Sequence, residues 1–251
     1  MWKQLLSLFK DSSLCREAFE EAIVMLRASH SMHRDSVAAL HGEGILVADI
    51  YERDRQVNKY ERSVRRKILT HLAVSPKPDL NSALVITSIV IDIERVGDYT
   101  KNIVELAAGL PEAFDGGELN EEIFDLERIV DGMFEDLVPA LKDSNEELAR
   151  GILRSHKSVS GRVEKGLQLL RSDQVLKGQS GRAVTAALYL RYLKRVSAHL
   201  KNVATSVVNP FHRIGYREKK KGDLDQASAG TMTDPEGTDE LEELEGDESR
   251  D

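Results

Sequence analysis

The chain contains 251 residues, of which 31% are charged and only 5% are aromatic, and its formal net charge at pH 7 is −8. This length allows one large domain or two small ones. A high charge content with few aromatic side chains favours long exposed helices over a β-sandwich. The single cysteine, Cys15, excludes an internal disulfide and fits a reducing compartment. We therefore expect a cytoplasmic protein of the all-α class.

The negative charge is concentrated at the C-terminal end of the sequence. From Gly222 onward there are twelve acids and one base, Arg250, so this tail carries −11 and the rest of the chain carries +3. The tail has too few apolar residues to offset the entropy of ordering, and we predict that residues 216–251 are disordered. The nearly neutral body argues against nucleic-acid binding. No apolar run is long enough to predict a transmembrane segment.

Hydrophobic residues recur at helical spacing along most of the chain, and they predict six long helices. The predicted helices span residues 13–40, 45–72 and 80–108 in the first half, and 119–141, 145–170 and 182–208 in the second. The segment Ser75-Pro76-Lys77-Pro78 stops the second helix, and Asp79 or Asn81 can cap the third. We expect two tandem three-helix bundles, over residues 1–110 and 118–211, placed end to end or side by side.

A nine-residue string in the third helix recurs one hundred positions later without its acids. The first copy is ERVGDYTKN (94–102) and the second is KRVSAHLKN (194–202). A repeat of this period indicates two similar halves. Because Lys194 replaces Glu94 and Ala198 replaces Asp98, only the first half retains paired carboxylates. Lys194 either supplies the charge of a missing cation or is simply exposed to water.

The acids of the first copy are arranged to meet a cation. Glu94 and Asp98 stand four residues apart on one helix, so their side chains emerge on the same face. Asn102 continues that stripe by one turn. Gly97 costs roughly 1 kcal/mol against alanine in a helix interior, and it would allow a neighbouring helix to come close.

A second polar stripe lies on the preceding helix, where Asp54, Asn58 and Glu61 follow the i, i+4, i+7 spacing of one helical face. An antiparallel neighbour places this stripe opposite the first. Carboxylate and amide oxygens suit magnesium, manganese, iron or zinc ions. Acids at this spacing more often form a solvated helix face, so the spacing alone leaves a metal site as a hypothesis. His30 and His33 lack a third zinc ligand nearby in sequence.

Two strings carry a resemblance to a known family. The segment 92–98 (DIERVGD), followed by Lys101-Asn102-Ile103, resembles the signature of the PhoU family of phosphate-signalling regulators. The segment 54–61 (DRQVNKYE) is similar to that family's companion motif. The resemblance covers the body to about Phe211. It implies a pair of three-helix bundles with metal clusters of the iron or zinc type, and an adaptor role between a phosphate transporter and a sensor kinase.

Carried onto this chain, the resemblance implies a specific set of metal ligands. They are Glu94, Asp98 and Asp54, with Asn58, Glu61 and Asp92 as further candidates. We expect at most one metal site, in the first half, because the second half lacks the acids. The identity of the metal and the formation of a homodimer are left open.

Two other functions remain as alternatives to the metal-binding adaptor. The first is a metal-free helical scaffold, or an accessory protein of a phosphate permease. The second is an enzyme that uses a carboxylate-bound metal. Because the sequence contains no nucleophile–base arrangement and no phosphate-cradling glycine loop, we predict that the protein is not an enzyme.

Overall fold

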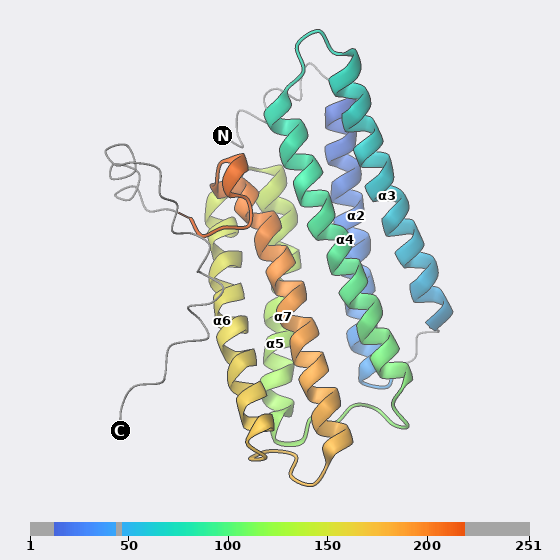
Figure 1. Cartoon of the computed structure of the whole chain (residues 1–251), viewed down its shortest axis with the longest axis vertical. Helices are drawn as coiled ribbons and strands as arrows, with labels where there is room; N and C mark the ends of the chain where they lie inside the picture. The colour runs from blue at the N-terminus through green and yellow to red at the C-terminus, as the bar shows by residue number, and fades with distance from the viewer. Residues whose placement is uncertain (1–12, 44–46, 219–251) are drawn as a thin grey trace, which may run out of the picture. The chain divides into compact units, whose positions relative to one another are not determined.

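Six α-helices make up the part of the chain that the computed structural model describes, residues 13–43 and 47–218 (Figure 1). They are α2 (Ser13–Leu40), α3 (Val47–Val74), α4 (Leu80–Ala108), α5 (Asn120–Lys142), α6 (Glu146–Arg171) and α7 (Ser180–Val208). Two short 3₁₀ helices, η1 (Gly117–Leu119) and η2 (Phe211–Arg213), flank the second half. The all-α class is confirmed, and every predicted helix is present with ends within two residues of the prediction.

Two helices, α4 and α6, begin at side chains that accept hydrogen bonds from free backbone N–H groups. Asp79 caps α4, because its Oδ1 accepts a hydrogen bond from the backbone N–H of Ser82 at 3.1 Å. Asn145 caps α6 in the same way, accepting from the N–H groups of Glu147 and Leu148, both at 3.1 Å. Of the two caps predicted for α4, the structure therefore selects Asp79.

The two halves lie side by side and share an internal two-fold relation. The helices α2, α3 and α4 contact one another, as do α5, α6 and α7, and the halves meet where α4 packs on α7 and α2 on α5. In Figure 1, α4 and α7 run in opposite directions. Across this pair Asp92 contacts His199, and Tyr99 contacts Tyr192. With a repeat offset of one hundred, Asp92 corresponds to Tyr192 and Tyr99 corresponds to His199. The two contacts therefore join the same two repeat positions, with the halves exchanged.

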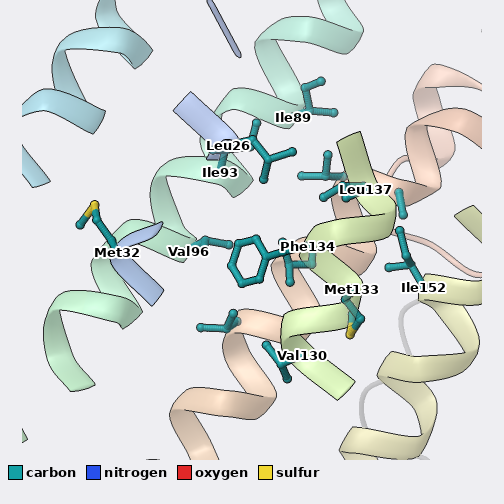
Figure 2. Close-up of a cluster of buried hydrophobic side chains, with 14 of the residues drawn as sticks. Leu26, Met32, Ile89, Ile93, Val96, Val130, Met133, Phe134, Leu137 and Ile152 are labelled. Atoms are coloured by element: carbon teal, nitrogen blue, oxygen red, sulfur yellow. The ribbon is translucent and has the colours of Figure 1, made fainter. Parts of the chain in front are cut away.

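One hydrophobic core passes through both halves. Figure 2 shows side chains from α2, α4, α5 and α6 meeting, with the ring of Phe134 on α5 directed toward Val96 on α4. The pattern of burial along residues 91–103 recurs position by position along 191–203. The two copies of the sequence repeat therefore bury the same helix faces.

None of the described helices is both long and apolar enough to cross a membrane. The described residues up to Arg217 belong to one compact unit. The predicted disordered tail falls, from residue 219 onward, outside the described residues.

Candidate functional site

The two acidic stripes face each other between α3 and α4. The ammonium nitrogen of Lys101 lies 3.2 Å from Asp98 Oδ1 on its own helix and 3.5 Å from Asp54 Oδ2 on α3. Carboxylates from both helices therefore lie within the reach of a single cationic group. Their side chains are 28% and 13% exposed, respectively, so solvent screens the pair only in part. Sequence spacing predicted this facing arrangement, but it did not identify the lysine that contacts both helices' carboxylates.

Gly97 lies where α4 approaches α3, opposite Val57. A Cβ atom added at Gly97 would lie 3.4 Å from Val57 Cγ1, which is an ordinary van der Waals contact. The backbone of α4 therefore comes close to α3 at Gly97, and the space for a Cβ atom there is at the lower limit of ordinary contact. The second half has Ser197 at this position, and its Oγ lies 3.0 Å from His156 Nδ1.

The remaining acids of the group have arginine partners. Glu61 contacts Arg65 at 2.8 Å, and Arg95 approaches both Asp98 at 3.1 Å and Glu94 at 3.6 Å. Burial raises the pKa of Glu94, and the negative charges of Asp98, Glu61 and Asp54 raise it further against the opposing effect of Arg95. Three other carboxylates therefore act electrostatically on Glu94.

The structure separates the polar candidates into two places. Asn58 stays with the acids, because its Nδ2 lies 3.4 Å from Asp54 Oδ2. Asn102 is half-buried further along α4. Asp92 instead faces the second half, where its Oδ1 lies 2.8 Å from His199 Nδ1 and accepts a hydrogen bond from Asn202 at 3.0 Å. Asp92 thus connects α4 to α7 and does not join the other candidates.

The donor chemistry of the cluster fits a hard divalent cation such as Mg²⁺ or Mn²⁺, which prefers carboxylate and amide oxygens. The carboxylates among these donors are engaged by Lys101, Arg65 and Arg95. Among residues 13–43 and 47–218, no group of three or more His, Cys, Asp and Glu side chains is gathered around one point. A metal ion would therefore have to displace internal cations to reach the acids.

The corresponding face of the second half is basic. Lys194 contacts Glu164 of α6 at 2.7 Å, so its ammonium is paired with a carboxylate on the neighbouring helix and is not simply exposed to water. Lys201 donates to the backbone oxygen of Gly215 at 2.8 Å. Burial, together with the charges of Lys201 and Lys194, lowers the pKa of His156 to about 4. This half retains the helical fold of the site but lacks the acids that correspond to Glu94 and Asp98.

Among the described residues, three histidine–carboxylate contacts join the two halves, and sequence reasoning missed all of them. The pairs are His30 with Asp131 at 2.6 Å, His41 with Glu127 at 2.8 Å and His199 with Asp92 at 2.8 Å. His30 is therefore paired with a carboxylate on α5. Partners this far apart along the chain leave no periodic signal in the sequence.

Comparison with known proteins gives a family match and several relatives. The family model described as "PhoU domain" matches the chain twice, over residues 23–107 and 123–207. A protein of Pseudomonas putida is 26% identical over 178 residues, which span 69% of this chain and 70% of that protein. A protein of Pseudomonas aeruginosa is 26% identical over 181 residues, spanning 69% and 74%. Both are described as "Phosphate-specific transport system accessory protein PhoU homolog".

Two solved structures share the fold. The crystal structure of PhoU from Pseudomonas aeruginosa has a TM-score of 0.70 and 23% identity, covering 80% of this chain and 97% of that chain. The crystal structure of the phosphate transport system regulatory protein PhoU from Streptococcus pneumoniae has a TM-score of 0.65 and 17% identity, covering 78% and 92%. At these identities the likeness concerns the helical architecture.

Proposed function

The chain belongs to the PhoU family, and from that premise we propose that it is a non-catalytic accessory regulator of a phosphate transport system. The observation that carries this proposal is the double match of the PhoU domain, one copy in each half. The relatives' descriptions as accessory proteins support it. The protein would act by binding a phosphate transporter, a sensor kinase, or both, and so restrain the response to phosphate starvation.

We further propose that the α3–α4 cluster binds a metal ion. Asp54, Asp98 and Glu94 would hold it, with Asn58 and Glu61 as additional oxygen donors. A bound divalent cation would neutralise the repulsion among the carboxylates and cross-link the two helices. A ligand that binds only the folded state stabilises that state. The metal would therefore stabilise the arrangement of α3 and α4 to which a partner protein binds.

Metal binding predicts a thermal shift that depends on the acids of α4. Protein freed of metal with a chelator should melt at a higher temperature when Mn²⁺ is added, by an amount equivalent to about 2.7 kcal/mol at a hundredfold excess over Kd. The variant Glu94→Gln/Asp98→Asn should show no such shift. A matched control is Glu17→Gln/Glu21→Gln, which neutralises two acids four residues apart that contact Lys67 on α3. An equal shift in both variants would contradict the assignment.

The regulatory role predicts a defined phenotype. A strain that lacks the gene should express a phosphate-starvation reporter in phosphate-rich medium, and the wild-type gene should restore repression. If the metal-binding α3–α4 cluster is required, Glu94→Gln/Asp98→Asn will fail to restore repression. Lys194→Gln, which changes the residue of the second half that corresponds to Glu94, will restore it. Reporter activity is the measurement.

The same strains distinguish the alternatives. Full complementation by Glu94→Gln/Asp98→Asn would favour a metal-free helical scaffold that uses the same partners. A deletion strain whose reporter stays repressed and whose phosphate uptake is unchanged would remove the regulatory proposal itself.

A further inference from the structure

Lys101 lies between two acids of the cluster, one on each helix. It arises from α4 one turn after Asp98, and its ammonium group lies between Asp98 and Asp54, at 3.2 and 3.5 Å. Its side chain is only 21% exposed. The ammonium is therefore held at the junction of the two helices, in contact with a carboxylate from each.

We infer that Lys101 is a built-in counter-cation that competes with a divalent metal ion for Asp54 and Asp98. The inference rests on the proposed metal cluster, and it adds a residue that sets the affinity of that cluster. With the ammonium in place, α3 and α4 are linked without metal. With a metal bound, the lysine must leave the two carboxylates.

Electrostatics supports this competition. The ammonium and a metal ion are both attracted to the same half-buried anions, and two cations at one point repel each other. Burial lowers the pKa of Lys101, but the hydrogen bond to Asp98 and the charge of Asp54 outweigh burial and raise it overall. The ammonium therefore remains charged at neutral pH. Arg95 also contacts Asp98, but its side chain is 55% exposed, so water can replace it at little cost.

The second half provides an internal comparison. Lys201 stands at the same position of the repeat, yet it donates to the carbonyl oxygen of Gly215 at 2.8 Å. Ala198 takes the place of Asp98 there, so one of the two carboxylates that hold Lys101 has no counterpart. At this repeat position, the lysine of the first half, Lys101, contacts a carboxylate on each of α3 and α4.

The test is a titration of metal-free protein with Mn²⁺, followed by the electron paramagnetic resonance signal of the free ion. Lys101→Met should bind Mn²⁺ tighter than wild type by about tenfold or more, which corresponds to about 1.4 kcal/mol. Lys101→Arg, which keeps the charge, should bind as weakly as wild type. Lys201→Met, the matched control in the second half, should also leave the affinity unchanged.

A second readout requires no metal. Without its counter-cation the cluster is left with repelling carboxylates, so metal-free Lys101→Met should melt below wild type by about 2–4 °C. Adding Asp98→Asn to this variant should recover part of the loss, because it removes one of the repelling charges. Circular dichroism verifies that each variant is folded.

The outcomes separate the inference from the proposed site. Equal Mn²⁺ affinity of wild type and Lys101→Met would overturn the competition while leaving the metal site intact. Absence of Mn²⁺ binding in both proteins would overturn the competition together with the metal site. Tighter binding in Lys201→Met as well would show a general effect of charge and would also overturn the inference.

Discussion

Replacing Phe134 with alanine is expected to destabilise the six-helix unit by about 3–5 kcal/mol, the usual cost of truncating a buried phenylalanine. Phe134 is 1% exposed. Its ring stacks on His30 of α2 at a centroid distance of 4.6 Å and is directed toward Val96 of α4 (Figure 2). The substitution therefore leaves a cavity where the two halves meet. Urea unfolding followed by circular dichroism measures the change.

The shape of that unfolding transition also reports on how the halves are coupled. Because one core passes through both halves, Phe134→Ala should lower the midpoint of a single transition. The matched control is Phe124→Ala on the same helix, since Phe124 is 47% exposed and its truncation should cost less than about 1 kcal/mol. Two separate transitions, or equal effects of the two variants, would contradict a shared core.

Acidification should destabilise the protein by about 3 kcal/mol through His33 alone. His33 is fully buried, and burial lowers its pKa from 6.5 to about 4, with His30 and Arg34 lowering it further and Asp131 opposing them. Between pH 6.5 and about 4, His33 binds a proton in the unfolded chain but stays neutral in the folded chain. The free energy of unfolding therefore falls between pH 6.5 and about 4 and then stops responding to this group.

The variant His33→Met isolates this contribution. Within the described residues, neither ring nitrogen of His33 has a hydrogen-bond partner, so an apolar side chain of similar size removes an unsatisfied group. We expect this variant to be at least as stable as wild type at pH 7 and to lose less stability on acidification. A weaker pH dependence should remain, because the pKa of His156 is also lowered to about 4. The free energy of unfolding is measured with urea at several pH values from 6.5 to about 4. If it falls as steeply with decreasing pH in His33→Met as in wild type, the assignment to His33 is refuted.

Local spacing predicted most of the helices and the acidic faces. Helical periodicity and the breaks at proline and glycine act over a few residues, so the six helices and their ends could be predicted. The i, i+4 spacing of Glu94 and Asp98, and that of Asp54 and Asn58, placed each pair on one face of its helix. Lys101 stands three residues after Asp98, a spacing that could have been recognised as an ion pair within the same helix.

The sequence by itself determined two similar halves, only one of which carries paired acids, because a repeat and its substitutions are visible in one dimension. Only the tertiary structure decided that the halves pack side by side, that Asp92 faces His199 on α7, and that Lys101 lies between two carboxylates. These contacts join different helices, and those between the halves join residues about one hundred positions apart. They depend on how the apolar faces of separate helices pack into one core, which the spacing within a single helix does not encode.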